Sequence, residues 1–163
     1  MTRAIATNTT AELAQMLAFV RPRHHMLLAT TRHDGRPQIS PVSGGVDPDG
    51  RIVISSYPAR AKIRNLERDE QASVVVLSDD WDGAWIQVDG NAEVLNMPEA
   101  GDGLVEYFRS ISGEHSDWAE YREAMAIQNK SLIRIEPTRW SPISTGGFPP
   151  EVTARLDARE GSR

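Results

Sequence analysis

In six segments of this chain, apolar and polar residues alternate or short apolar runs stand between turn residues, which is typical of β-strands. The segments span residues 25–32, 37–46, 51–56, 71–78, 84–95 and 131–140. Only short turns separate the first three segments, one of them carrying the hairpin signal Asp34–Gly35, so no helix fits between them. We therefore predict an antiparallel β-barrel and not a doubly wound α/β sheet.

Four further segments have helical character and lie outside the predicted strands. They span residues 11–20, 59–68, 101–113 and 116–128, and Thr9 or Thr10 is expected to cap the first. The predicted fold class is thus mainly β (α+β), with peripheral helices. The expected division is an N-terminal helix (1–22), a barrel domain (23–140) and a C-terminal tail (141–163). The tail is rich in Gly, Pro and charge and is expected to be mobile unless a partner subunit holds it.

Composition narrows the classes of function. A length of 163 residues suits one domain with its own core. The absence of cysteine excludes disulfides, thiolate nucleophiles and cysteine-based metal sites, and fits a cytoplasmic protein. A net charge of -5 argues against nucleic acid as a partner. No apolar run is long enough to span a membrane, and we recognise no signal peptide. The expected partner is a small molecule or another protein.

The segment 55–69, SSYPARAKIRNLERD, gathers four cations at the start of a predicted helix. A helix N-terminus favours acidic residues, so cations there suggest a bound anion. On a helical wheel Arg60, Arg64 and Arg68 form one stripe, whereas Lys62 lies at the border of the packing face. The opposite, apolar face consists of Ala59, Ile63 and Leu66.

Two interpretations of these cations remain open. Arg64 and Arg68 are expected to form a solvated face, with Glu67 available to pair with Arg64. Lys62 either extends along the packing face to water or meets a charge. Together with the hydroxyls of the preceding strand end and the backbone amides, two of the cations could form a phosphate cradle. This cradle consists of Ser55, Ser56, Arg60 and Lys62.

Other residues with chemical potential give weaker signals. The four histidines have no metal-chelating spacing, so no metal site is predicted. A loop carries three aspartates, Asp79, Asp80 and Asp82, which are expected to be solvated. The aromatic residues that could line a substrate site, or simply pack, are Trp81, Trp118 and Tyr121.

The order and spacing of several segments resemble a known superfamily. The segments are LLATTRHDGRPQISPV, RIVISSYPARAKIRNLERDEQASVVV, WIQVDGNAEV and SGEHSDWAEYREAM. Over roughly residues 20–140 they are similar to the split-barrel flavin and deazaflavin oxidoreductases related to pyridoxamine 5′-phosphate oxidase. Within this superfamily they most resemble the actinobacterial branch that uses the 8-hydroxy-5-deazaflavin coenzyme F420.

The resemblance implies a homodimer of six-stranded split barrels with two cofactor sites at the subunit interface. In the family, the segment that matches Arg60 and Lys62 binds the cofactor phosphate. The implied cofactor-binding residues are Gln38, Ser40, Pro41, Val42, Ser55, Ser56, Ala59, Arg60, Lys62, Trp85 and Gln87. Trp85 stands where flavin-binding relatives carry Gln, so it either stacks at the site or fills the interface.

The resemblance favours F420 as the cofactor, with FMN as the alternative. Both carry a ribityl phosphate, so Lys62 does not separate them. Only F420 adds an anionic oligoglutamate tail, which Arg60 and Arg64 could meet. It implies F420H2-dependent hydride transfer to a small organic acceptor, with no catalytic side chain assigned. The ending ARLDAREGSR lacks the Arg-Leu-x-Pro pattern of the vitamin B6 oxidases, which argues against that activity. The alternatives are an FMN-binding oxidoreductase and a non-catalytic cofactor carrier.

Overall fold

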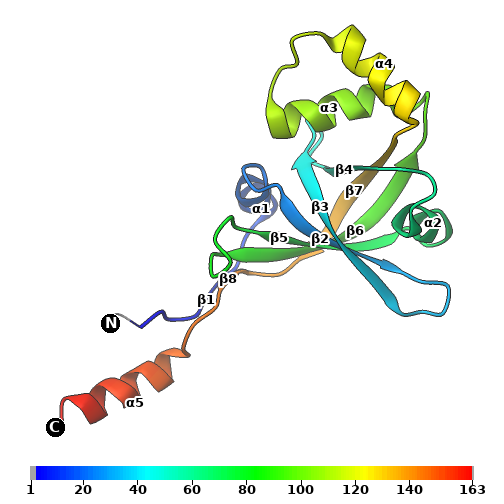
Figure 1. The fold of residues 1–163 in the computed structure, drawn as a ribbon. Coiled ribbons are helices and arrows are strands. Elements are labelled where there is room, and N and C mark those ends of the chain that lie inside the picture. Colours follow the sequence, from blue (N-terminus) through cyan, green and yellow to red (C-terminus); the bar gives the residue numbers. More distant parts are fainter. Residues whose placement is uncertain (1–2, 163) are drawn as a thin grey trace.

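Six antiparallel strands close into a β-barrel in the computed structural model, which describes residues 3–162 (Figure 1). The strands are β2 (His25–Thr31), β3 (Pro37–Val46), β4 (Ile52–Ser56), β5 (Gln71–Leu77), β6 (Trp85–Leu95) and β7 (Ser131–Trp140). Their order is β6-β5-β2-β3-β4-β7, and pairing of β6 with β7 closes the ring. The predicted split-barrel α+β fold is confirmed.

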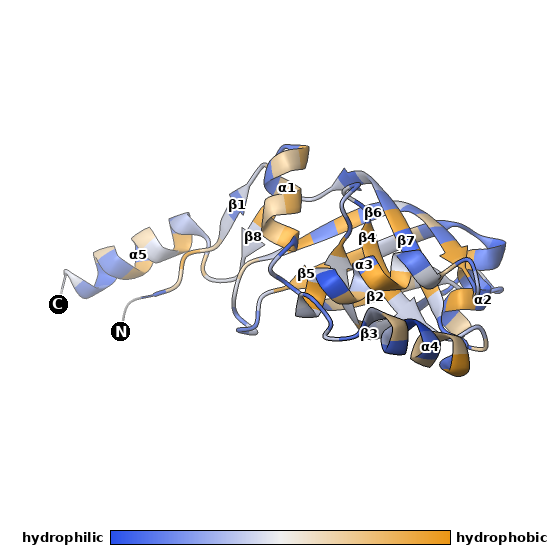
Figure 2. Ribbon diagram, turned by 90° about the horizontal axis from the view of Figure 1, so that it is seen from above, coloured by the Kyte–Doolittle hydropathy of each residue, from blue (hydrophilic) through white to orange (hydrophobic). Residues whose placement is uncertain are grey.

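The core of the barrel follows the period-two pattern of the strands. On β2 the buried residues are Met26, Leu28 and Thr30, and β5 alternates in the same way. Seen from above, hydrophobic positions recur along the strands, whereas the connecting loops are largely hydrophilic (Figure 2). Full burial of each large aliphatic side chain stabilises the fold by roughly 1.5–3 kcal/mol.

Besides α1, which is described below, three helices pack on the barrel in two places. The helix α2 (Ala61–Arg68) follows β4, and the hairpin of α3 (Gly101–Ser112) and α4 (Trp118–Gln128) covers the outside of β4 and β7. Ring contacts among Phe108, His115, Trp118 and Tyr121 hold the hairpin together, with centroids 5.0–5.8 Å apart. The aromatic residues of this hairpin therefore pack against one another.

The N-terminal helix α1 (Leu13–Val20) is shorter than the expected segment 11–20. Its N-cap residue is Glu12, whose backbone N–H donates to Oε1 of Gln15 at 2.8 Å. Thr9 lies instead in the short strand β1 (Thr7–Thr9). The prediction of a Thr9 or Thr10 cap was wrong, because Thr9 is drawn into pairing with a distant strand.

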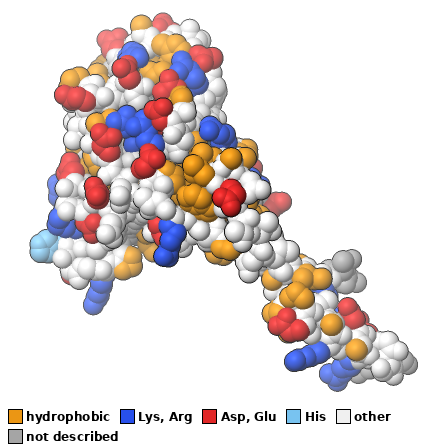
Figure 3. Space-filling view, turned by 180° about the vertical axis from the view of Figure 1, so that it is seen from behind, with side chains coloured by type: hydrophobic (Ala, Val, Ile, Leu, Met, Phe, Trp, Pro, Cys, Tyr) orange, Lys and Arg blue, Asp and Glu red, His pale blue; other side chains and the backbone are white. Residues whose placement is uncertain are grey.

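An arm extends from the barrel and contains both ends of the described chain (Figure 1). It is built from β1, β8 (Ile143–Thr145) and α5 (Pro150–Glu160), with β1 antiparallel to β8. Arg3 forms ion pairs with Asp157 and Glu160 on α5. Seen from behind, hydrophobic side chains gather on the barrel near the base of this arm (Figure 3). The tail was predicted without secondary structure, yet it carries one strand and one helix.

One glycine permits the closure of the barrel. The register of β6 against β7 shifts between Asp89 and Gly90. A Cβ atom at Gly90 would lie 2.2 Å from the carbonyl oxygen of Glu136. The two backbones approach so closely at this bulge that only glycine fits without displacing a strand.

Candidate functional site

The barrel is not fully paired along β3. This strand pairs with β4 only over Gly44–Val46, whereas it pairs with β2 along its whole length from Pro37 to Ser43. Residues 37–43 therefore present a free strand edge. Across from this edge, β4 ends at Ser56 and the chain continues into α2. We call residues 37–43 the β3 edge.

The β3 edge is poorly suited to pair with another strand. The N–H of Gly44 donates to the carbonyl of His24 on the β2 side at 3.0 Å, so in an antiparallel ladder the amides of residues 37, 39, 41 and 43 face away from β2. Pro37 and Pro41 have no N–H to offer there. An added β-strand could not form a continuous ladder of backbone hydrogen bonds at this edge. A small molecule does not need such a ladder.

Three of the four predicted β3 residues share one face. Gln38, Ser40 and Val42 stand directly opposite the buried residues of β2, so their side chains lie on the inner face of the sheet. The hydroxyl of Ser40 is buried and has no hydrogen-bond partner within residues 3–162. Buried hydroxyls in proteins are rarely left unpaired, so this oxygen fits a site that a ligand completes. Pro41 lies on the opposite, outer face.

A chain of hydrogen bonds connects Gln38 to α2. The Thr30 hydroxyl donates to Gln38 Oε1 at 3.3 Å and accepts a bond from Asn65 Nδ2 at 3.0 Å. Arg68 Nη2 donates to Asn65 Oδ1 at 3.2 Å and to the carbonyl of Thr31 at 2.7 Å. Arg68 is exposed, as predicted for a solvated face, but its guanidinium also fastens α2 to β2, which the prediction did not include. Asn65 was not singled out in the sequence.

The start of α2 differs slightly from the predicted helix 59–68. Arg60 is the N-cap residue with extended backbone, and the helix begins at Ala61. Ile63 is buried as predicted, but Ala59 precedes the helix and is exposed, so its assignment to the packing face was wrong. Lys62 is half-buried, as its position at the border of that face indicated, and Arg64 is exposed.

Cations gather around the start of α2 without carboxylates to neutralise them. Lys130 Nζ lies 4.1 Å from the centroid of the Tyr57 ring, and Arg60 Cζ lies 6.0 Å from the same centroid. In the described part of the chain, no ion pair involves Arg60, Lys62, Arg64 or Lys130. The first turn of α2 contains no acidic residue either. An anion bound here would meet these cations and the free amides of a helix N-terminus.

The hydroxyls of Ser55 and Ser56 lie at the end of β4, directly before this group. Ser56 is buried and stands opposite Ser131 of β7, and Lys130 is the residue next to Ser131. The β4–β7 pairing therefore brings Lys130 to the end of β4 from a position distant in the sequence. We call the three cations Arg60, Lys62 and Lys130, together with the adjacent hydroxyls of Ser55 and Ser56, the cation group.

The environment of Lys62 disfavours its charged ammonium form in the free protein. Burial lowers the pKa of Lys62 below its ordinary value of 10.5, and the nearby Arg60 lowers this pKa further. Both effects penalise the ammonium form of Lys62. A bound phosphate would offset the penalty by supplying negative charge.

This lowered pKa predicts a pH dependence of phosphate-ester binding. Above the lowered pKa, Lys62 is neutral in the free protein and must take up a proton to meet the anion. Affinity should therefore fall as the pH rises from neutral through the lowered Lys62 pKa, at a pH below 10.5. Arg60→Gln should shift this fall to higher pH, because it removes the like charge. Calorimetric titration of a phosphate-ester ligand across this range, with Arg64→Gln as control, measures the shift.

The predicted residues of β6 lie apart from the cation group. Trp85 and Gln87 point outward from the barrel, on one face as predicted, and Gln87 Nε2 donates to Asp89 Oδ1 at 3.0 Å. Leu66 of α2 borders Ala92 of β6. Trp85 is seven residues from Ala92 along the strand, a separation of about 23 Å. Within a single chain, Trp85 and Gln87 therefore do not lie near the cation group.

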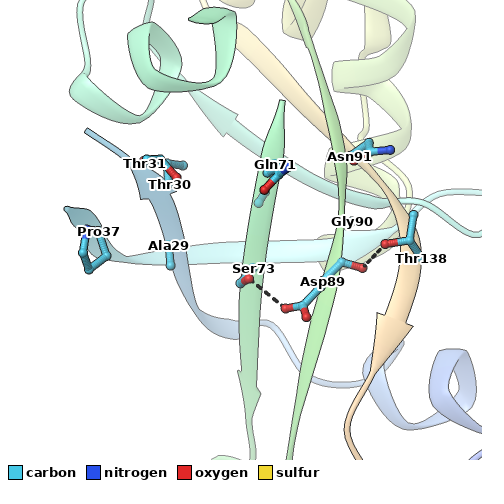
Figure 4. A pocket seen from close by; sticks show the side chains of 11 residues that line it. Ala29, Thr30, Thr31, Pro37, Gln71, Ser73, Asp89, Gly90, Asn91 and Thr138 are labelled. Atoms are coloured by element: carbon cyan, nitrogen blue, oxygen red, sulfur yellow. Dashed lines mark hydrogen bonds between the residues drawn. The ribbon is translucent and has the colours of Figure 1, made fainter. Parts of the chain in front are cut away.

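Beside Gln87 the outer face carries a polar hollow of about 440 Å³ (Figure 4). Ser73 Oγ donates to Asp89 Oδ1 at 2.7 Å, and Thr138 Oγ1 donates to the Asp89 carbonyl at 3.2 Å. Burial raises the pKa of Asp89, but hydrogen bonds from Gln87 and Ser73 and the charge of Arg139 lower it more, so the net pKa lies below its ordinary value. Asp89 is thus held as a carboxylate whose oxygens already have partners. The sequence pattern gave no sign of this hollow.

The remaining candidates do not form a site. Within residues 3–162 no group of three His, Asp or Glu side chains could hold a metal ion. Tyr121 donates to the carbonyl of Leu104 at 2.8 Å, and burial raises its pKa to about 12. Tyr121 and Trp118 therefore pack in the helical hairpin, while Trp81 is exposed on a turn. No helix in the described chain is both long and apolar enough to cross a membrane.

The described chain is thus a six-stranded barrel that leaves one strand edge open beside a cationic helix start. The comparison with protein families identifies this barrel. The family model described as pyridoxamine 5′-phosphate oxidase matches residues 13–144, which is most of the chain, and the protein belongs to this family.

Solved structures with the same fold carry diverse functions. A conserved hypothetical protein from Mycobacterium tuberculosis is 24% identical, with 88% of this chain and 90% of that chain covered and a TM-score of 0.68. An F420 reductase is 20% identical, with 76% and 94% covered and a TM-score of 0.58. A heme-binding protein from Mycobacterium smegmatis is 20% identical, with 81% and 54% covered and a TM-score of 0.60. At these identities the likeness shows the fold, and the ligand must be argued from the site.

Proposed function

We propose that this protein is an F420-dependent oxidoreductase that transfers a hydride from F420H2 to a small organic acceptor, in the cytoplasm and as a homodimer. The observation that carries the proposal is the cation group, where Arg60, Lys62 and Lys130 lie without carboxylate partners at the start of α2. Membership of the pyridoxamine 5′-phosphate oxidase family supports a flavin-type cofactor with a ribityl phosphate.

The residues present fit such a cofactor. Lys62 and Arg60 would hold the phosphate together with the α2 amides and the hydroxyls of Ser55 and Ser56. The unpaired Ser40 hydroxyl would supply a hydrogen bond on the β3 side. Gln38 is positioned beside it by Thr30 and Asn65. When bound, the reduced deazaflavin supplies the hydride. The protein's part is to orient donor and acceptor.

The number of cations favours F420 over FMN. A single phosphate is satisfied by Lys62, Arg60 and the helix amides, which leaves Lys130, 4.1 Å from the centroid of the Tyr57 ring, without an anion. The oligoglutamate tail of F420 carries additional carboxylates that would meet Lys130. FMN has no such tail, so the charge of Lys130 matters less for it.

Lys130→Ala should therefore lower the affinity for F420 several-fold and change the affinity for FMN little. An exposed charge pair contributes about 0.2–1 kcal/mol, and more where it is partly desolvated. Fluorescence titration of both cofactors against the wild type and the variant measures the difference. Equal losses for the two cofactors would contradict the role assigned to Lys130.

The proposed function is tested by binding and turnover together. Purified protein is titrated with F420 and with FMN, and oxidation of F420H2 is followed with quinone, enone and tetrapyrrole acceptors. Tight binding of FMN without binding of F420 would favour an FMN-dependent oxidoreductase. F420 binding without turnover on any acceptor would favour a cofactor carrier.

The separation of the predicted residues supports the homodimer. Trp85 and Gln87 lie on the outer face, about 23 Å and about 17 Å along β6 from the part that contacts α2. If these residues contribute to a cofactor site, that site includes the cation group of another copy. Sedimentation equilibrium of the purified protein reports the oligomeric state, and a monomer would remove this part of the proposal.

A further inference from the structure

The helix α3 brings a phenol to one end of the β3 edge. It lies over the end of β3 (Figure 1), and its residues Tyr107, Ser110 and Ile111 share one helical face. A Cβ atom at Gly45 would collide with the Ser110 hydroxyl and lie 3.3 Å from Ile111 Cγ1, so this face touches β3 directly. From the same face, the Tyr107 hydroxyl donates at 3.4 Å to the carbonyl of Ser43, the last residue of the β3 edge.

The Tyr107 hydroxyl lies on the open side of β3. Along an antiparallel strand, the N–H and C=O of one residue point to the same side, and those of the next residue point to the other side. Gly44 bonds to His24 on the β2 side, so the Ser43 carbonyl points away from β2. The hydroxyl that donates to this carbonyl is therefore in the gap between β3 and β4, where a bound ligand would lie.

The register of the strands brings this hydroxyl to the same end of the gap as the cation group. Pairing of β3 with β4 ends at Gly44 and Ile54. Ser43 is one residue beyond this last pair, and Ser56 is two residues beyond it, which corresponds to about 3 Å and about 7 Å along the barrel. The cation group thus borders the gap from the β4 side, and Tyr107 borders it from the β3 side.

The hydroxyl of Tyr107 is loosely held, whereas its helix is fixed. Its 3.4 Å bond to the Ser43 carbonyl is much longer than the usual length of about 2.7–2.8 Å between two oxygens. The helix turn itself is tied down, because the Ser110 hydroxyl donates to the Tyr107 carbonyl at 2.8 Å and lies against Gly45. A ligand oxygen could take over the Tyr107 O–H without any movement of α3.

The donor at this end of the gap is neutral. Arg109, the cation of the same helix turn, donates to Glu114 at 2.6 Å and to Glu106 at 2.5 Å, so its charge is already paired. A phosphate is best met by cations, which the cation group supplies. A single neutral O–H suits the oxygen of an uncharged carbonyl group instead.

An apolar hollow of about 290 Å³ lies beside the same end of β3. Its lining includes Leu27, Pro41, Val42, Ser43 and Leu77. Ser43 therefore borders this hollow with its side of the strand and receives the Tyr107 hydroxyl at its carbonyl. Sites for small organic molecules combine apolar walls with a few polar groups that fix orientation, and this pairing has that composition.

We propose that Tyr107 is the catalytic acid of the reduction: its hydroxyl donates a hydrogen bond to the carbonyl oxygen of a small, uncharged enone or quinone, and its proton then passes to that oxygen. The inference rests on the proposed function. It adds the proton donor and the chemical class of the acceptor to that function.

The step balances when it is written for an enone. The hydride of the reduced cofactor forms a C–H bond at the β-carbon with its two electrons, the carbon–carbon double bond shifts toward the carbonyl carbon, and the carbonyl π pair moves to oxygen. That oxygen takes the Tyr107 proton, and the enol rearranges to the saturated ketone. Tyr107 recovers a proton from water, and the cofactor, oxidised by two electrons, releases one to water. The hydroxyl thus acts where negative charge develops.

Tyr107→Phe removes the hydroxyl and keeps the ring. With F420H2 and cyclohex-2-enone, kcat should fall by roughly a hundredfold to ten-thousandfold, the usual contribution of a general acid. The Kd for F420, titrated separately, should stay unchanged, because the cation group is intact. An unchanged kcat would overturn the proposal. A loss confined to cofactor affinity would overturn it as well, since Tyr107 would then be a ligand of the cofactor.

A second measurement needs no turnover. Protein loaded with oxidised F420 has no hydride to give, so cyclohex-2-enone labelled with ¹³C at its carbonyl carbon stays intact when it binds. A hydrogen bond weakens the C=O bond, so infrared difference spectra should show a lower carbonyl stretching frequency on the wild type than on Tyr107→Phe. The same frequency on both proteins would contradict a bond from Tyr107 to the acceptor.

Tyr121→Phe is the matched control on the same helical hairpin. It removes the hydroxyl that donates to the Leu104 carbonyl at 2.8 Å inside the hairpin. Its melting temperature should fall, while kcat of the folded protein and the carbonyl stretch of the bound enone stay at wild-type values. Tyr107→Phe should show the reverse pattern. If both variants lose activity in proportion to their loss of stability, Tyr107 has only a structural role and the proposal fails.

The failure of this proposal can be told from that of the proposed function. Wild-type turnover with F420H2 that Tyr107→Phe retains in full would leave the proposed function standing and overturn the role of Tyr107 alone. Reduction of the enone by reduced FMN and not by F420H2, with the loss in Tyr107→Phe, would end the F420 assignment and keep the acid. A wild type that reduces no carbonyl acceptor with either cofactor would overturn both.

Discussion

Lys62→Ala is expected to weaken cofactor binding by about 1.5–3 kcal/mol, the contribution of a charge-assisted hydrogen bond, which corresponds to a loss of roughly tenfold to more than a hundredfold in affinity. The reason lies in the environment of Lys62. It is half-buried beside Arg60 and has no carboxylate partner among residues 3–162, so its ammonium is poorly stabilised until an anion arrives. Calorimetric titration of F420 and FMN against wild type and variant measures the loss.

Arg64→Ala is the matched control for this experiment. Arg64 lies on the same helix, is exposed and forms no ion pair within the described residues, so its removal should change affinity little. Arg68, which the sequence would offer as the control, is unsuitable, because it holds Asn65 and the Thr31 carbonyl. If Lys62→Ala and Arg64→Ala have equal effects, the phosphate is not held by the inward side of α2.

Gly90→Ala is expected to destabilise the fold by roughly 1–3 kcal/mol, the range for overpacked sites. The added methyl carbon would lie 2.2 Å from the Glu136 carbonyl oxygen, and a backbone atom cannot rotate away as a side chain can. β6 and β7 must separate where they close the barrel. For a protein of this size the melting temperature should fall by roughly 2–12 °C, as measured by calorimetry.

Gly146→Ala provides the comparison for this variant. No atom lies within 4 Å of a methyl group at Gly146, and its backbone does not require a positive φ. The same chemical change should therefore leave the melting temperature nearly unaltered. An equally stable Gly90→Ala protein would mean that the bulge can relax, and that β6 and β7 are less tightly closed than the structure describes.

The strands of the barrel could be predicted because their signals are local. Alternation in β6 and β7 and the Asp34–Gly35 turn fixed the predicted segments to within about one residue of the observed ones. The arm could not be predicted in this way. β8 is three residues long and pairs with β1 across most of the chain, with Thr7 opposite Thr145. Neither strand has an alternating hydrophobic pattern, because β1 is exposed and β8 packs only Ile143 against the core.

The candidate site was predictable in its chemistry and less so in its arrangement. The wheel placed Lys62 and Ile63 correctly, since both depend on helical spacing alone. Lys130 was missed, because only the pairing of Ser56 with Ser131 brings it to Tyr57. That the predicted cofactor-binding residues contact a bound cofactor stays a prediction.

The prolines of the β3 edge bear on the behaviour of the protein at high concentration. An unpaired strand is ordinarily a template for edge-to-edge aggregation. Pro37 and Pro41 remove two of the four donors that an incoming chain would need, so the barrel keeps one strand open with only a broken ladder for an incoming β-strand. A substitution such as Pro41→Thr would restore one donor and supply a β-branched residue. This substitution would lower the colloidal stability of the protein, even where the fold and the ligand site are left intact.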